Sequence, residues 1–434
     1  MISLRRPRVA RTAALCLGLA AIARPAGAQS RVPDALSDRE FWRLFTTISE
    51  DGGTFPSENF VSNEKTYQFV IPTLQRTLTP GGVYLGVGPE QNFTYIANLQ
   101  PRLAVIFDIR RQNAMLHLMY KALFELSPTR ADFVTKLFAR PLSPSLPRTA
   151  PAAELFAEVA AAAPNDSIYN ATWKAIVARL TMDHGFALSE SDLASMRHVY
   201  SAFFEAGPEI SYSYRLGAPP AATPWLVTYA QLQTATNADS VNMSFLATEA
   251  GYRQLRAIQQ RNLVVPIVAD FAGSKAVRAV GEYLRARNMF VTTFYTSNVE
   301  QYLFGNFGAE KRFYENVLTL PIDSTSTFIR SLPGPPNAPG ANGGTIFISG
   351  ATFAIRIADS NGVRVVRPLT LDTSVVNAAV RSNALAPQLL TTSGAFTSGI
   401  SSMARTLQAF STGDLRAYSQ LTALTKTDGW NQPR

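Results

Sequence analysis

Short apolar runs alternate with amphipathic stretches over much of the chain, and this alternation predicts a mixed α/β protein. Residues 83–85 and 103–107 are apolar throughout, as is typical of strands that are covered on both faces. Between them lie a turn and a helix that would bury Phe93, Ile96 and Ala97. Because such a strand–helix–strand unit needs a right-handed crossover, the two strands are expected to be parallel.

The same alternation returns in the second half of the chain. Residues 263–269 and 290–295 are predicted strands, followed by helices over 274–287 and from Val299 onward. Residues 317–320 predict one more short strand. We therefore expect an α/β fold with a doubly wound, mostly parallel, Rossmann-like sheet.

Helices are expected on either side of the first strands. Residues 36–50 form an amphipathic helix, and residues 111–126 form an apolar one. Asn63 can cap a further helix, which Pro72 would kink or break. His117 lies in the apolar helix, where we expect a core residue.

Composition shifts divide the chain into segments. Helical periodicity between the two strand regions predicts a large helical insertion, and a segment rich in Pro and Gly predicts a linker. Because that linker lacks apolar residues to bury, we expect the core to fold without the residues beyond it. The expected organisation is a signal peptide at 1–28, the first half of a Rossmann-like core at 29–127, a helical insertion or cap at 128–255, the second half of the core at 256–330, a linker at 331–344, and a C-terminal extension at 345–434 with β-like stretches at 345–348 and 363–371.

The first 28 residues have the three parts of a secretory signal. A cluster of arginines precedes an apolar run at 13–23, and Ala26-Gly27-Ala28 comes next as a small-residue cleavage site. The apolar run is shorter than the roughly 20 residues that a membrane-spanning helix needs. We therefore predict cleavage after Ala28 and export to the periplasm or the outside of the cell.

Charge and cysteine content narrow the function classes. The first 28 residues hold five arginines and no acid, so the rest of the chain carries a formal charge of +4 rather than +9. That small excess does not indicate a nucleic-acid partner. The single cysteine, Cys16, lies in the signal, and the three histidines have no metal-ligand spacing, so no disulfide framework or metal site is expected. A small-molecule ligand is the expected partner, and the oligomeric state stays open.

Gly86 and Gly88 follow the first strand, and Asp108 ends the next strand 22 residues after Gly86. In Rossmann folds such glycines let the backbone approach a ligand, and such an acid accepts hydrogen bonds from ribose hydroxyls. Glu90 stands where a third glycine is common, and its charge opposes a pyrophosphate. Arg110 can pair with a ligand carboxylate or with Asp108. The alternative is a tight turn that binds nothing.

Two further segments come directly after strands at the same expected edge. In Asp270-Phe271-Ala272-Gly273-Ser274-Lys275, the acid can accept from an amine or act as a base, and Ser274 with Lys275 can hold an anion at a helix start. The alternative is that Ser274 only caps the helix and Lys275 is solvated.

The second of these segments runs from Tyr295 to Glu300. Ser297 and Glu300 have the spacing of a capping box, which leaves Tyr295 and Asn298 as the ligand candidates. Candidate catalytic residues are therefore Asp270, Tyr295 and Asn298. A G-x-S-x-G nucleophile motif and a P-loop are both missing, so a hydrolase is not expected.

Several of these segments together resemble an uncharacterised bacterial family whose members are similar in fold to class I S-adenosylmethionine-dependent methyltransferases. The segments are F-V-S-N-E at 60–64, V-Y-L-G-V-G-P-E-Q-N at 83–92, F-D-I-R-R at 107–111, D-F-A-G-S-K at 270–275 and F-Y-T-S-N-V-E at 294–300. The resemblance covers residues 40–330 approximately and implies S-adenosylmethionine as the cofactor. Tyr84 and Glu90 depart from the methyltransferase pattern, which has an acid and a glycine at these places.

Two functions are therefore hypotheses. One is a methyltransferase that binds S-adenosylmethionine or a related nucleoside, with an unknown acceptor. The other is an exported, non-catalytic ligand-binding protein that keeps the fold, since a fold does not determine a function. Either way, the carboxyl ends of the strands are expected to share one ligand pocket covered by the insertion. Its expected lining is Gly86, Gly88, Glu90, Asp108, Arg110, Asp270, Tyr295 and Asn298.

Overall fold

The computed structural model describes residues 34–212, 214, 227–306, 308–333, 345–349, 352–359, 362–370 and 396–425. The predicted signal peptide and its cleavage after Ala28 lie outside these residues. Within them, no helix has both the length and the apolar composition that crossing a membrane requires.

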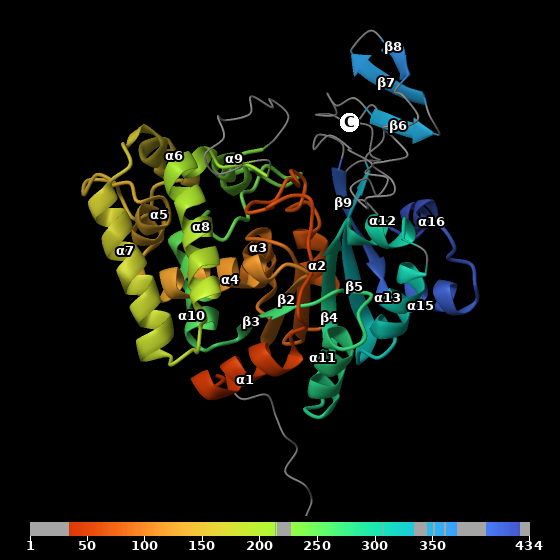
Figure 1. The fold of residues 1–434 in the computed structure, drawn as a ribbon, viewed down its shortest axis with the longest axis horizontal. Helices are drawn as coiled ribbons and strands as arrows, with labels where there is room; N and C mark the ends of the chain where they lie inside the picture. Colours follow the sequence, from red (N-terminus) through yellow and green to blue (C-terminus); the bar gives the residue numbers. More distant parts are fainter. Residues whose placement is uncertain are drawn as a thin grey trace, which may run out of the picture.

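Six strands form the core sheet in the order β3-β2-β1-β4-β5-β9 (Figure 1). Neighbouring strands are parallel except for β5 and β9, which are antiparallel. This order confirms the expected α/β class with a mostly parallel, Rossmann-like sheet. The strands are β1 (Val83–Val87), β2 (Leu103–Asp108), β3 (Val264–Val268), β4 (Val291–Ser297), β5 (Ile322–Pro333) and β9 (Phe396–Ser402).

The central strands are apolar because helices cover both of their faces. All six residues of β2 and all five residues of β3 are buried. Helix α4 (Arg111–Leu126) contacts both strands and is itself almost entirely buried. A continuous apolar run is what a parallel strand in this position requires, and the pattern located these elements correctly.

Further helices surround the sheet. Helix α1 (Asp38–Ile48) starts at the capping residue Ser37 and packs on β3, as its apolar stripe predicts. The other helices around the sheet are α2 (Ile71–Thr77), α3 (Gln91–Leu99), α10 (Glu249–Gln260), α11 (Ala276–Arg285), α12 (Val299–Phe304), α13 (Ala309–Val317), α15 (Met403–Ser411) and α16 (Tyr418–Leu424).

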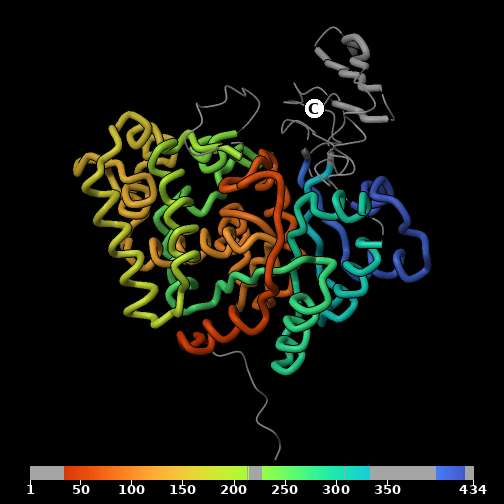
Figure 2. Tube along the Cα trace, viewed as in Figure 1, coloured from red at the N-terminus to blue at the C-terminus, as the bar shows by residue number. Residues whose placement is uncertain are grey.

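The chain between β2 and β3 is helical, as expected for residues 128–255. Its helices gather beside α4, on the side of the sheet away from α15 and α16 (Figure 1), and Figure 2 traces the chain into this bundle and back to β3. They are α5 (Arg130–Phe138), α6 (Ala152–Ala161), α7 (Asp166–Ala178), the π-helix η1 (Arg179–Asp183), α8 (Glu190–Ala206), the 3₁₀-helix η2 (Gly207–Glu209) and α9 (Tyr229–Thr234).

Two local predictions are wrong. The helix expected from Asn63 begins only at Ile71, with Pro72 in its first turn, where the missing N–H costs nothing. Residues 317–320 are the end of α13 and a turn rather than a strand. A short apolar run marks burial, and burial alone does not distinguish a strand from the end of a helix.

The expected boundary after residue 330 is also wrong. Strand β5 continues to Pro333, and β9 returns beside it with Gly399 opposite Arg330. Met403 and Leu407 of α15 are buried against the same core. The physical reason is that β5 would otherwise expose its unpaired backbone at the edge of the sheet, and β9 covers that edge.

A second, three-stranded antiparallel sheet lies between β5 and β9 in the sequence, in the order β6-β7-β8. Its strands are β6 (Thr345–Ser349), β7 (Thr352–Asp359) and β8 (Gly362–Thr370). The β-like stretches expected at 345–348 and 363–371 are confirmed, and β7 adds a strand that was not predicted. The linker residues from 334 to 344 lie outside the described chain.

Candidate functional site

The two glycines and the acid of the first constellation meet at the carboxyl ends of β1 and β2. Val87 pairs with Phe107 in the sheet, and the N–H of Gly88 donates to the Phe107 carbonyl oxygen at 3.2 Å. Gly88 has a φ of 78°, which only glycine adopts readily. The spacing from Gly86 to Asp108 therefore predicted the placement of these residues.

The space beside this turn is filled by the side chain of Asn92 from α3. Its Oδ1 accepts a hydrogen bond from the Tyr84 hydroxyl at 2.8 Å. A Cβ atom on Gly86 would lie 2.0 Å from that Oδ1. Gly86 is thus required by the protein's own packing. The Asn92 amide donates to the carbonyl oxygens of the turn, those of Val87, Gly88 and Pro89.

The carboxylate of Asp108 is held by Arg110. The guanidinium Nε lies 2.9 Å from Oδ1 and Nη2 lies 2.8 Å from Oδ2, while the Arg110 backbone N–H also donates to Oδ1 at 2.9 Å. Both residues are buried, at 7% exposure each. A bidentate pair of this kind fixes its geometry. The oxygens expected to bind a ribose are therefore engaged within the chain.

Residues 49–62 cross over these strand ends, and we call them the N-terminal strap. Arg110 Nη1 donates to the carbonyl oxygens of Ser57 and Glu58 in the strap. The carboxylate of Glu58 in turn lies 2.7 Å from His198 Nε2 on α8. The strap is thereby tied both to the Asp108 pair and to the helical insertion.

The strap also occupies the predicted anion site before α11. Glu50 accepts hydrogen bonds from the backbone N–H groups of Asp270 at 2.8 Å, Lys275 at 3.1 Å and Ala276 at 3.0 Å. Lys275 Nζ donates to the Ser49 carbonyl oxygen at 2.7 Å. The anion held at this helix start is thus the chain's own carboxylate.

The side chain of Asp270 bonds within its own turn, and Ser274 does not have the capping role that was the alternative to ligand binding. Asp270 Oδ1 accepts from the N–H of Ala272 at 2.9 Å, which closes a turn. Ser274 does not cap the helix, because the residue before α11 is Lys275 and no side chain caps it.

Glu90, expected at the ligand loop, is fully buried beside α3. One of its oxygens accepts from the Ser62 N–H at 3.4 Å, and the other has no partner among the described residues. Burial raises the pKa of Glu90 to about 8. Burial, then Tyr229 and then Glu90 raise the pKa of Tyr120, and burial followed by Glu90 raises the pKa of Tyr229. Glu90 is therefore an interior residue that neighbours these tyrosines.

A second buried carboxylate, Glu64, lies at the carboxyl end of β4. Its Oε1 accepts from the Tyr295 hydroxyl at 2.7 Å and from Ser297 Oγ at 2.5 Å, and its Oε2 accepts from Gln91 Nε2 at 3.2 Å. In the described part of the chain no cation pairs with Glu64. Burial raises its pKa, although these hydrogen bonds oppose the rise.

Sequence reasoning did not identify Glu64 as a site residue. It lies in the 60–64 segment that carries part of the family resemblance, and that was the only signal in the sequence. The sequence correctly predicted Tyr295 at the end of a strand. Its hydroxyl, which was expected to face a ligand, donates to Glu64 instead.

The capping box predicted at Ser297 and Glu300 is wrong. The residue before α12 is Asn298, whose side chain makes no capping bond, and Ser297 points to Glu64 instead. Glu300 is buried and pairs with Arg330, with Nε 2.6 Å from Oε2 and Nη2 3.0 Å from Oε1. A buried arginine needs such a partner more than a helix end needs a cap.

Ser297 has an unusual backbone. Its φ is 53°, in the left-handed region, at the point where β4 passes into α12. Ser297 and Asn298 are both only partly buried, unlike Tyr295. Ser297 and Asn298 are therefore accessible polar groups at the end of β4, and the predicted residues Asp270, Ser274 and Lys275 before α11 are exposed as well.

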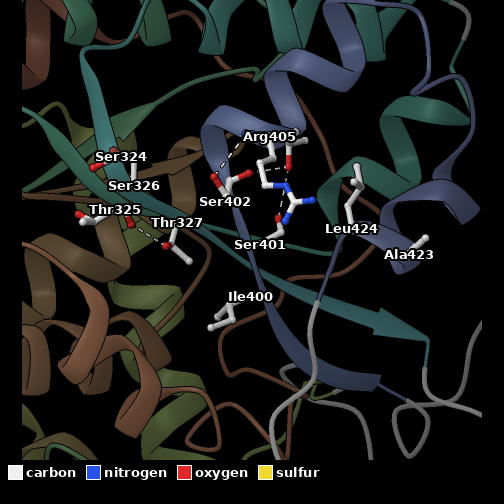
Figure 3. A pocket seen from close by; sticks show the side chains of 11 residues that line it. Ser324, Thr325, Ser326, Thr327, Ile400, Ser401, Ser402, Arg405, Ala423 and Leu424 are labelled. Atoms are coloured by element: carbon white, nitrogen blue, oxygen red, sulfur yellow. Dashed lines mark hydrogen bonds between the residues drawn. The ribbon is translucent and has the colours of Figure 1, made fainter.

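Surface hollows lie at the opposite edge of the sheet. One of them has a volume of about 250 Å³ and lies between the start of β5 and α15. It is lined by serine and threonine hydroxyls, by Arg405 and by apolar side chains such as Ile400 and Leu424 (Figure 3). The Arg405 backbone donates to Ser402 Oγ at 3.3 Å. Two more, of about 350 and 100 Å³, lie near Arg102 and near Thr292. None of these three is lined by a predicted site residue.

The described residues contain no group of three or more His, Asp or Glu side chains placed to hold a metal ion. A family model described as Domain of unknown function (DUF7790) matches residues 59–142 and 154–360. A search of curated proteins found no match.

Proposed function

Because the chain belongs to this family of unknown function, we propose its function from the site itself. We propose an exported protein that binds a small organic ligand at the carboxyl end of β4. It keeps the Rossmann-like fold that methyltransferases use, and it does so without S-adenosylmethionine. The observation that carries this proposal is the bidentate pair of Asp108 with Arg110.

S-adenosylmethionine needs a free acid for its ribose and an open glycine turn. In this chain Arg110 takes both oxygens of Asp108, and Asn92 fills the space at Gly86. The strap covers the pair through Ser57 and Glu58. The residues present do not fit the cofactor, because a nucleoside would first have to displace a buried ion pair.

The end of β4 has the features of a small ligand site. Ser297 and Asn298 supply accessible polar groups. Beside them Phe55 of the strap stacks edge-on against Tyr302, with ring centroids 5.4 Å apart, and Tyr302 is 43% exposed. The partial burial of Tyr302 raises its pKa to about 12, while a hydrogen bond with Asn298 opposes the rise. Polar groups beside an aromatic wall suit an uncharged molecule with one polar end.

A methyltransferase remains the second candidate, favoured by the strand order β3-β2-β1-β4-β5 and by the resemblance in sequence. This function would need the strap to leave Arg110, and Arg110 to release Asp108, before a nucleoside could bind.

Calorimetry with S-adenosylmethionine and S-adenosylhomocysteine at millimolar concentration separates the two. We expect no binding to the unmodified chain. The proposal is overturned in favour of the methyltransferase if the unmodified chain binds either compound and Asp108→Ala weakens that binding by about 10–150-fold. This factor is the expected effect of losing one charge-assisted hydrogen bond, about 10–150-fold in affinity.

Ligand binding at the end of β4 is tested directly by ligand-observed fluorine NMR with a set of small fluorinated esters and amides. We expect binders whose signals broaden with the unmodified chain and with Arg405→Ala, which alters the hollow in Figure 3. The broadening should disappear with the double change Asn298→Ala and Tyr302→Ala. If the double change has no effect on any binder, the ligand site is not at the end of β4.

A further inference from the structure

We propose that Ser297 and Glu64 are a nucleophile and its general base, and that the ligand is an ester or a similarly activated acyl compound. This inference rests on the ligand site proposed at the end of β4 and specifies the chemistry of that site.

The backbone of Ser297 is the first observation. A non-glycine residue with a φ of 53° is strained, and such strain persists where the surrounding structure holds it. Here it falls between a strand and a helix, the position at which a strained turn presents a nucleophilic serine in many acyl-transfer enzymes. Tyr295 and Val299 stand where that motif has glycines, which is why the sequence did not predict it.

Capping does not explain the strain. Asn298 is the residue before α12, and Ser297 Oγ makes no bond to the backbone of that helix. The hydroxyl instead lies 2.5 Å from Glu64 Oε1. The left-handed backbone therefore serves to aim the hydroxyl at a carboxylate 233 residues away in the sequence.

Glu64 has the surroundings of a base. Tyr295 and Gln91 hold the carboxylate in one orientation, and none of the described cations neutralises it. Burial raises the pKa of Glu64, which makes its ionised form a stronger proton acceptor. A serine hydroxyl needs such a partner, because it is a weak nucleophile on its own.

The reaction uses only the ligand and water. Ser297 Oγ attacks the carbonyl carbon while its proton passes to Glu64 Oε1. The bond between the carbonyl carbon and the leaving alcohol oxygen breaks, and that oxygen takes the proton from Glu64. Water then attacks the acyl-serine ester, again with Glu64 as proton acceptor. This step releases a carboxylic acid and restores Ser297 and Glu64.

The test is covalent labelling of the full-length protein with a fluorophosphonate, followed by peptide mass spectrometry. Ser297 Oγ displaces fluoride from phosphorus, so a single adduct on Ser297 is expected. Glu64→Gln should slow labelling by about 100-fold or more, as expected for loss of a general base. The labelling rate should rise with pH, because Glu64 must be ionised to accept the proton.

Two variants control for folding and for chance reactivity. Ser297→Gly removes the hydroxyl and relieves the backbone strain, so the variant should stay folded and take no label. Ser240 also has a left-handed φ, of 61°, and is exposed, so Ser240→Ala should be labelled at the unmodified rate. Retained labelling in Ser297→Gly would overturn the inference.

A second, smaller compound is used in case the fluorophosphonate is too large to reach Ser297. p-Nitrophenyl acetate should leave an acetyl group on Ser297 that the same mass measurement detects. If neither compound modifies Ser297 in the folded protein, the inference is overturned. The fluorine NMR experiment then distinguishes two cases, because it depends on Asn298 and Tyr302 and not on the Ser297 hydroxyl. Binding without modification of Ser297 overturns only the acyl-transfer chemistry, and absence of binding overturns the ligand site as well.

Discussion

His117 anchors the glycine turn from within α4. Its Nε2 lies 2.8 Å from the Gly88 carbonyl oxygen, and the ring packs edge-on against Phe93. Burial lowers the pKa of His117 to about 4, although the bond to Gly88 opposes this. The residue is therefore neutral in the folded chain at a pH where an unfolded chain would protonate it.

This difference predicts an acid-sensitive stability. Below about pH 6.5 the unfolded chain binds a proton at His117 that the folded chain does not bind until about pH 4, so stability falls as the pH falls. The loss from this residue between about pH 7 and pH 4.5 is about 2–3 kcal/mol. Urea unfolding at the two pH values should show a smaller loss for His117→Gln. His198→Gln is the control, and an equal pH dependence in the unmodified chain and His117→Gln would contradict the prediction.

At the scale of elements, the strap joins parts of the fold that sequence analysis treated separately. Through Glu50 the strap holds the turn before α11, and through the Glu58 side chain it reaches α8. The carbonyl oxygens of Ser57 and Glu58 accept hydrogen bonds from Arg110. Groups that looked suited to a ligand anion thus bind a carboxylate of the same chain. A helix start with free N–H groups stabilises any anion, whether a ligand or a side chain supplies it.

Glu50→Gln should therefore destabilise the turn before α11. It keeps the size of the side chain but removes the charge from three hydrogen bonds, and the loss of unfolding free energy should be about 1.5–3 kcal/mol. Asp51→Asn, which changes an exposed neighbouring acid, should have little effect. Urea unfolding gives the free energy, and hydrogen exchange should speed up at the amides of Lys275 and Ala276. Equal stability of the two variants would mean that Glu50 does not hold this turn.

At the scale of the whole molecule, the C-terminal segment completes the sheet. β9 pairs along the outer side of β5, and Arg330 on β5 bonds to Ser401 on β9 as well as to Glu300. Met403 and Leu421, which come after β9 in the sequence, are buried. The core therefore includes residues that precede the second sheet in the sequence and residues that follow it.

A chain that ends at Arg330 should be insoluble or lack cooperative unfolding, since it would expose the edge of β5 and remove Ser401, a hydrogen-bond partner of buried Arg330. The control keeps β9. Pro333 lies opposite Phe396, so a two-residue Asn-Gly turn can replace residues 334–395 and close a hairpin. That chain should be soluble and unfold cooperatively. A soluble, cooperatively unfolding chain ending at Arg330 would restore the domain boundary expected from the sequence.

The sequence by itself determined the central strands, the long helix α4 and the meeting of the glycine turn with Asp108, because apolar periodicity and spacing act over short distances along the chain. Only the tertiary structure decided which groups those residues bind. Glu50 meets the turn at Asp270 from 220 residues away, and Glu64 meets Ser297 from 233 residues away. The pairing of β9 with β5 also joins residues far apart in the sequence, from Thr327 with Ser402 to Pro333 with Phe396. Such contacts depend on how the whole chain packs, and a local pattern describes only which side chains are polar.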